Sequence, residues 1–244
     1  MTTEEFSNEF DILYNNIMSN QAPGLDEYEK SVFLTKAQME SLKNYFNPKG
    51  NKYGQGFDEN AKRQIDFSSL ITVATPSVYT PITGTYTKFD DRSILYKLPT
   101  DILLILNETA INTVDGSGRL ISIIPINYEE YARLMSKPWK QPLKNQGWRL
   151  LHSTNSDVIS EVVIKYGSTL SDYKIRYLRR PKPIILANLG NGTSTITIDG
   201  LNTITDCELD PILHPEILQR AVELAKAAYL GDLNSNIEIG KRSE

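Results

Sequence analysis

Amphipathic helical periodicity occurs at the two ends of the chain, and this constrains the fold more than any other feature. Near the N-terminus, four apolar residues recur at four-three-four spacing, which places them on one face of a helix. These residues are Phe6, Phe10, Leu13 and Ile17. Residues 213–231 keep helical spacing after Pro215, a residue that suits a first helical turn. Strand-like and turn-rich segments lie between the ends, so the sequence predicts an α+β fold.

The first 46 residues have the pattern of a helical hairpin. Thr2 and Glu5 have the spacing of a capping box at a helix start. Pro23 disfavours helix at the residue before it, so the chain is expected to turn there. Thr35 and Gln38 repeat the capping spacing and predict the start of a second helix. This hairpin either packs only on its own core or also faces a neighbouring molecule.

Residues 47–95 carry many glycines and prolines and have no helical period. Such a segment is too long for an ordinary connection inside a compact domain. Two alternatives remain open. The segment is either a surface loop or an extended arm that adds to the sheet edge of a neighbouring subunit.

Residues 96–109 are predicted to form a buried helix, because Pro99 suits its first turn and a dense apolar run follows. We expect this helix to join residues 1–46 and 213–231 in one helical, adaptor-like domain. The N- and C-terminal helices are expected to pack together in that domain. Residues 232–244 form a polar tail without periodicity, which only a partner would order.

Residues 110–200 are predicted to be a β-rich insertion with an antiparallel sheet. Residues 115–118 have the composition of a hairpin turn. Asn127 and Glu130 then have capping-box spacing, which predicts a short helix that ends before Pro138. A three-strand meander and a short fourth strand are expected to follow. Their ranges are 147–152, 158–166, 172–178 and 194–198.

Composition restricts the kinds of chemistry that the chain is expected to perform. The net charge of −4 argues against broad attraction to phosphate backbones. No apolar run approaches the ~20 residues of a membrane span, so no membrane contact is expected. One cysteine, Cys207, and two histidines, His152 and His214, do not make a zinc site. We expect His214 to have a capping or solvent-facing role.

No catalytic motif is present, so the chain is predicted not to be an enzyme and to have no catalytic, cofactor-binding or metal-binding residues. The adjacent acids Asp90-Asp91 and Glu129-Glu130 are expected to be solvated. One concentrated basic set stands out, and it consists of Lys174, Arg176, Arg179, Arg180 and Lys182. It either contacts DNA, forms an ordinary solvated edge, or makes a salt bridge with an acidic neighbour such as Asp26-Glu27 on another subunit.

Four segments resemble a known family. They are residues 8–38, 98–108, 177–183 and 207–214. The chain resembles the ring or tail-adaptor (head-to-tail connector) structural proteins of crAss-like short-tailed bacteriophages. The resemblance implies a virion protein that forms a dodecameric ring below the portal and extends the genome-ejection channel.

The same resemblance implies where the protein acts and with what. Its partners would be copies of itself, the portal protein and adjacent ring or tail proteins, with non-specific contact to genome DNA in the channel. Its place would be the head–tail interface of the virion, assembled in the host bacterial cytoplasm. The alternatives are a receptor- or fibre-attachment module of the tail, and an enzyme with an unrecognised site.

Overall fold

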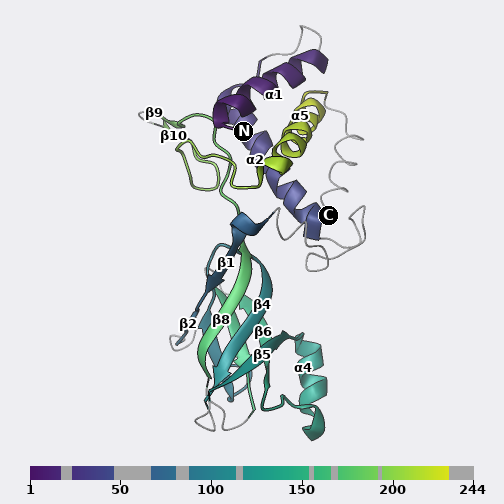
Figure 1. The fold of residues 1–244 in the computed structure, drawn as a ribbon, viewed down its shortest axis with the longest axis vertical. Coiled ribbons are helices and arrows are strands. Elements are labelled where there is room, and N and C mark those ends of the chain that lie inside the picture. Colours follow the sequence, from purple (N-terminus) through teal and green to yellow (C-terminus); the bar gives the residue numbers. More distant parts are fainter. Residues whose placement is uncertain are drawn as a thin grey trace. The chain divides into compact units, whose positions relative to one another are not determined.

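The computed structural model describes residues 1–17, 24–46, 67–80, 88–113, 118–153, 157–165, 170–191 and 194–230. The chain divides into two compact units (Figure 1). The helical unit combines Met1–Leu70 with Pro181–Glu244, and the sheet unit is Ile71–Arg180. The predicted α+β class is confirmed. No helix within these ranges is both long and apolar enough to cross a membrane.

The helical unit contains the two ends of the chain, as predicted. Its helices are α1 (Thr3–Ile17), α2 (Glu27–Phe46) and α5 (His214–Leu230), with short 3-10 turns η2 (Ser68–Leu70) and η4 (Pro211–Leu213). Two short strands, β9 (Gly190–Asn191) and β10 (Ser194–Thr195), pair with each other. Helix α5 packs against both α1 and α2 (Figure 1). Their shared core includes Phe6, Leu34, Leu42, Ile217 and Ala221.

Helix α1 begins with the predicted capping box. The backbone N–H of Thr2 donates to the Glu5 carboxylate at 2.8 Å, and the N–H of Glu5 donates to the Thr2 hydroxyl at 3.2 Å. Phe6 and Phe10 are fully buried, but the predicted Leu13 is exposed and Tyr14 is buried in its place. Both residues lie near the apolar face of the helix, and the packing of the other helices selects Tyr14.

Helix α2 begins at Glu27, so the prediction that it starts at Thr35 is wrong. A different capping box, Asp26 with Glu29, forms its N-terminus, with backbone-to-carboxylate hydrogen bonds of 3.1 and 2.7 Å. Thr35 lies inside the helix, where its hydroxyl accepts from the backbone N–H of Ile184 at 3.1 Å. The spacing of a capping box therefore also occurs where no helix begins.

The sheet unit is built on one eight-stranded sheet with the order β1-β8-β4-β5-β6-β7-β3-β2. The strands are β1 (Ile71–Ala74), β2 (Ser77–Val78), β3 (Ser93–Lys97), β4 (Ile102–Asn112), β5 (Arg119–Pro125), β6 (Gln146–Ser153), β7 (Val158–Val163) and β8 (Leu170–Arg179). All neighbouring strands are antiparallel except β5 and β6, which are parallel. Helix α4 (Tyr128–Met135) and the 3-10 turn η3 (Pro138–Lys140) connect those two strands.

The predicted helix at residues 96–109 is wrong, because this segment ends β3 and forms most of β4. Strand β4 pairs with β8 on one side and with β5 on the other, for example through Ile105 opposite Tyr177 and Ala110 opposite Ile121. A short, unbroken apolar run has no distinctive period, so periodicity alone cannot separate a buried helix from a central strand.

The predicted hairpin is confirmed, since β4 and β5 pair from Thr109 opposite Ser122 to Asn112 opposite Arg119. The three strands predicted after it also exist, but they do not form a meander. Strand β8 pairs with β1 and β4, whereas β7 pairs with β3 and β6. Alternation within β8 is as expected, because Tyr173, Ile175 and Tyr177 are buried. Alternation identifies the buried face of a strand and not its neighbours.

The predicted arm at residues 47–95 is only partly described. Residues 47–66 and 81–87 lie outside the described residues, as does the predicted polar tail. The described part of the segment belongs to the fold of its own chain, because β1 pairs with β8 and β2 pairs with β3. The strand expected at 194–198 is the two-residue β10.

Candidate assembly surfaces

His214 is packed into the interior of the helical unit, whereas Cys207 is only partly buried. His214 is buried and not solvent-facing, and its Nε2 lies 3.0 Å from the Leu209 carbonyl oxygen. Its ring packs against Phe6 with centroids 5.2 Å apart, and burial lowers its pKa. Burial raises the pKa of the Cys207 thiol to about 11, which makes this cysteine a poor nucleophile.

In the sheet unit, Glu161 is fully buried and lies at the centre of a polar network. One carboxylate oxygen accepts from the backbone N–H groups of Phe89 and Asp90, at 2.9 and 3.0 Å, and from the Ser93 hydroxyl at 2.5 Å. The other oxygen lies 2.8 Å from Nε2 of His152. The network attaches the segment before β3 to β6 and β7.

Asp90 was expected to be solvated, but it is buried beside this network. Its carboxylate accepts from the Arg92 guanidinium at 2.8 Å and from the Tyr131 hydroxyl. Burial alone would raise the pKa of Asp90, but the hydrogen bonds from Arg92 and Tyr131 hold it below its ordinary value. An adjacent pair of acids in sequence therefore need not be solvated.

A second buried carboxylate, Glu108 on β4, accepts from the Tyr173 hydroxyl at 2.7 Å and from Arg149 at 3.2 Å. Burial raises the pKa of Glu108 despite these partners. Both networks connect strands within the sheet unit, which is a structural role. Across the described residues, no group of three or more His, Cys, Asp or Glu side chains is placed to hold a metal ion.

The predicted basic set is divided between the two units. Lys174 and Arg176 are exposed on the same face of β8, while Lys182 belongs to the helical unit. The Lys182 ammonium lies 3.7 Å from the Glu208 carboxylate, and its backbone N–H donates to the same side chain at 3.0 Å. Lys182 therefore has an acidic partner in its own chain. Salt bridges from this set to Asp26 or Glu27 of another subunit stay a prediction.

The helical unit contains a hollow of about 380 Å³ with a predominantly apolar lining. Helices α1, α2 and α5 all contribute to it, together with Leu25 just before α2. The lining residues are Tyr14, Leu25, Tyr28, Glu29, Val32, Phe33, Ala225, Ala228 and Tyr229. We call this feature the apolar hollow. Of the alanines on α5, Ala221, Ala225 and Ala227 are buried in their own unit, and Ala228 is exposed at the hollow.

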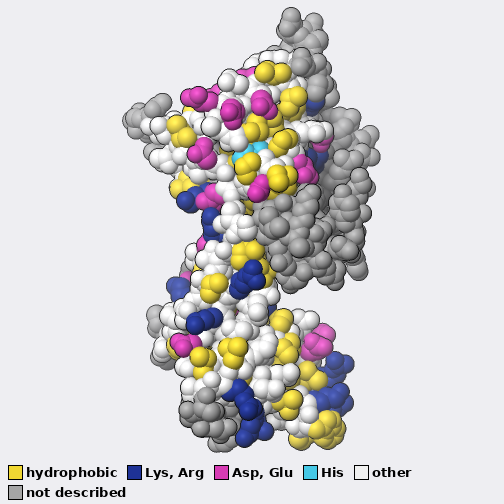
Figure 2. Space-filling model, viewed as in Figure 1, with side chains coloured by type: hydrophobic (Ala, Val, Ile, Leu, Met, Phe, Trp, Pro, Cys, Tyr) yellow, Lys and Arg dark blue, Asp and Glu magenta, His cyan; other side chains and the backbone are white. Residues whose placement is uncertain are grey.

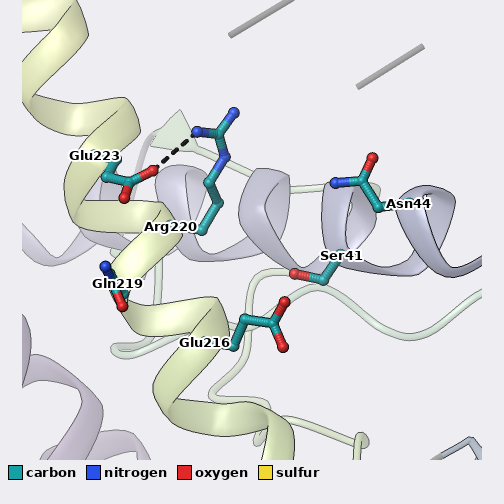
Figure 3. A pocket seen from close by; sticks show the side chains of 6 residues that line it. All are labelled: Ser41, Asn44, Glu216, Gln219, Arg220 and Glu223. Carbon is teal, nitrogen blue, oxygen red and sulfur yellow. Dashed lines mark hydrogen bonds and ion pairs between the residues drawn. The ribbon is translucent and has the colours of Figure 1, made fainter. Parts of the chain in front are cut away.

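A second hollow of about 290 Å³ lies between α2 and α5 and is polar (Figure 3). Arg220 is its central group. The guanidinium Nε lies 2.5 Å from a Glu40 carboxylate oxygen and Nη1 lies 3.0 Å from Glu223. These ion pairs join α5 to α2, and the remaining lining groups, Ser41, Asn44, Glu216 and Gln219, are small, neutral or acidic. This arrangement holds the two helices together.

The sheet unit presents an exposed loop with an aromatic residue, which follows α4. We define the Trp139 loop as residues 136–144. Trp139 is 76% exposed and Leu143 is 55% exposed. Three exposed lysines flank them, namely Lys137, Lys140 and Lys144. The sequence pattern predicts only that the preceding helix ends before Pro138, and it assigns no role to this loop. The signal that would have identified it is a tryptophan between two prolines in a lysine-rich segment.

Comparison with known proteins decides the family. A family model described as phage tail ring protein 3/4 matches residues 1–236. The chain belongs to this family of crAss-like phage ring proteins. It is 54% identical over 244 residues to "Ring protein 4/5" of Bacteroides phage crAss001, and the match covers 100% of both chains. It is 34% identical over 229 residues to "Ring protein 3" of the same phage, which covers 92% of this chain and 95% of that protein.

The predicted resemblance is thereby confirmed, and the ring protein is a structural, tail-related component of a phage particle. A structural role agrees with the geometry. The buried titratable groups Glu161, Glu108, Asp90 and His214 are used in packing, whereas the apolar hollow and the Trp139 loop leave apolar surface exposed on each unit. Such patches on a protein surface commonly mark sites of protein–protein contact.

Proposed function

We propose that this chain forms a homo-oligomeric, dodecameric ring in the head-to-tail connector of a short-tailed phage, where it extends the genome-ejection channel. The observation that carries the proposal is the match along the full length of both chains to a ring protein. A closed ring needs a heterologous interface, in which each subunit presents two different surfaces to its neighbours. The apolar hollow and the Trp139 loop are two such surfaces.

The proposed partners are the portal protein and the adjacent rings of the stack, with non-specific contact to genome DNA in the channel. The relationship of this chain to both ring protein 4/5 and ring protein 3 of one phage supports stacking of similar rings. The charge also supports a channel role. A net charge of −4 avoids tight binding of DNA phosphates, which would slow a genome that must slide.

Electron microscopy of the purified protein, alone and mixed with the portal protein and neighbouring ring proteins, tests the proposal. We expect closed rings with dodecameric symmetry and a central channel. Strictly monomeric protein in every mixture would contradict it. A protein that does not assemble with itself or with the portal protein, but binds glycans or tail fibres, would instead favour the attachment-module alternative.

A further inference from the structure

We propose that neighbouring subunits of the ring are joined by the Trp139 loop of one copy, which docks into the apolar hollow of the next copy. This inference rests on the proposed ring and names the surfaces that close it. The occupant of the hollow is thus a second copy of this chain, contributing residues 136–144.

The Trp139 loop has the chemistry of an interface anchor. Trp139 is 76% exposed, more than any other large apolar residue in the described part of the chain. A tryptophan buries on the order of 150–250 Å² when it is enclosed. Tryptophan is also among the residues that contribute most to binding at protein interfaces. Beneath it, Pro142 is buried and restricts the loop backbone, so less conformational entropy is lost on docking.

The apolar hollow has the matching chemistry. At about 380 Å³, it lies within the size range of pockets that bind small molecules, so it has room for an indole ring. Tyr28, Phe33 and Tyr229 supply ring surfaces for an indole to pack against. The exposed Ala228 lacks the bulk to block the entrance. The ammonium of Lys36 lies 6.0 Å from the centroid of the Phe33 ring, so one of these rings already faces a lysine side chain.

Charge favours pairing between unlike units of two copies. The helical unit has 20 acidic and 12 basic residues, a net charge of −8, whereas the sheet unit has 10 acidic and 14 basic residues, a net charge of +4. On the face drawn in Figure 2, acidic side chains gather over the helical unit and Lys and Arg side chains over the sheet unit. At the proposed contact, Glu29 and the exposed Asp26 meet a loop carrying Lys137 and Lys140. Complementary charge orients such an encounter.

Like units of two copies would repel each other by the same charges. Contact of a helical unit with a sheet unit is heterologous, and a heterologous contact generates a ring when its rotation closes. The charge difference therefore favours a ring over a symmetric dimer.

The first experiment is Trp139→Ala in the full chain, with assembly followed by analytical ultracentrifugation and electron microscopy. Trp139 is exposed, so circular dichroism and the melting temperature should stay unchanged. We expect the protein concentration at half-assembly to rise at least about tenfold. The matched control is Leu120→Ala, which removes a residue of the same unit that is 66% exposed and lies on β5. The control should assemble as the unaltered chain does.

The second experiment fills the hollow with Ala228→Trp and then mixes the two variants. Each variant alone should fail to assemble at concentrations where the unaltered chain forms rings. A Trp139→Ala copy keeps a functional hollow, and an Ala228→Trp copy keeps a functional loop. An equimolar mixture should therefore form dimers and no rings, because only one productive contact exists.

The outcomes separate the two proposals. No assembly of the unaltered chain, alone or with its partners, would overturn the ring itself. Rings that form equally well with Trp139→Ala would overturn only the loop-in-hollow contact. Monomers in the mixture would overturn it as well, since they would show that the loop and the hollow do not meet.

A Trp148→Phe variant leaves Trp139 as the single tryptophan, and its emission should shift to shorter wavelength on assembly. An unshifted emission in assembled rings would also overturn the contact.

Discussion

At the scale of residues, the buried side chains that could take part in acid–base chemistry hold the fold together instead. Glu161 organises backbone N–H groups ahead of β3, and Glu108 joins β4 to β6 and β8 through Arg149 and Tyr173. Buried carboxylates need such partners, because an unpaired buried charge is costly. The exposed residues that matter for the proposed assembly, above all Trp139, carry no catalytic chemistry.

The thiol of Cys207 is predicted to react slowly. Its pKa of about 11 lies above the ordinary 9.0, so burial lowers its thiolate fraction at pH 7 about a hundredfold. Alkylation by iodoacetamide should be slower by about tenfold or more in the native protein than in the same protein unfolded in urea, because the greater nucleophilicity of a thiolate with a high pKa offsets part of the hundredfold effect. Equal rates in the two states would contradict the raised pKa of Cys207.

Asp90 is predicted to make stability depend on acidic pH. Its folded pKa lies below the ordinary 3.8, so the unfolded chain binds its proton more tightly. The stabilisation from Asp90 is fully present above pH ~4 and is lost as pH falls through the folded pKa. Asp90→Asn should lower the free energy of unfolding by about 1–3 kcal/mol at pH 7, and this difference should shrink toward pH 2.

Urea unfolding across this pH range measures the effect of Asp90. The matched control is Asp91→Asn, because Asp91 is the adjacent acid and is exposed. The control should behave like the unaltered protein at each pH. A difference between Asp90→Asn and the unaltered protein that stays constant with pH would show that the Arg92 and Tyr131 contacts do not depend on its charge.

At the scale of elements, helix starts are decided by side chains that reach backbone N–H groups. Three capping spacings were predicted, and one of them, Thr2 with Glu5, forms. Asn127 is the N-cap of α4 but its side chain makes no capping hydrogen bond. Asp26 with Glu29 forms a box that was not predicted.

Asp26→Ala is predicted to lower the free energy of unfolding of the helical unit by about 1 kcal/mol, because the N–H of Glu29 loses its acceptor. Asn127→Ala is the control, since no side-chain cap exists there to be removed. Thermal or urea unfolding followed by helical circular dichroism measures both. An equal loss in both variants would mean that the hydrogen bond seen at Asp26 contributes nothing specific.

At the scale of the whole molecule, the two units differ in how the chain builds them. The sheet unit is one continuous stretch, Ile71–Arg180, whereas the helical unit needs both ends of the chain. Separate buried clusters support the sheet unit, including Tyr96, Ile121, Tyr173 and Ile175 in one and Trp148 and Leu150 in the other.

Residues 71–180 expressed alone are therefore predicted to fold. A continuous unit with its own core does not need the rest of the chain. We expect β-type circular dichroism and a single cooperative thermal transition. The control is residues 1–70 alone, which lack α5 and should not reach native helicity, since α5 packs on both α1 and α2. An unfolded 71–180 fragment would show that the units depend on each other.

The sequence by itself determined the helices at both ends, the β4–β5 hairpin, the burial pattern of β8 and the family, because these depend on local spacing or on residue identity. Only the tertiary structure decided that residues 102–112 form a strand, that β8 pairs with β4 and β1, and that Asp90 is buried. It also decided that Trp139 is exposed while Tyr28, Phe33 and Ala228 line one hollow. Each of these depends on contacts between residues far apart in the chain. Local sequence patterns do not determine the free energy of such contacts.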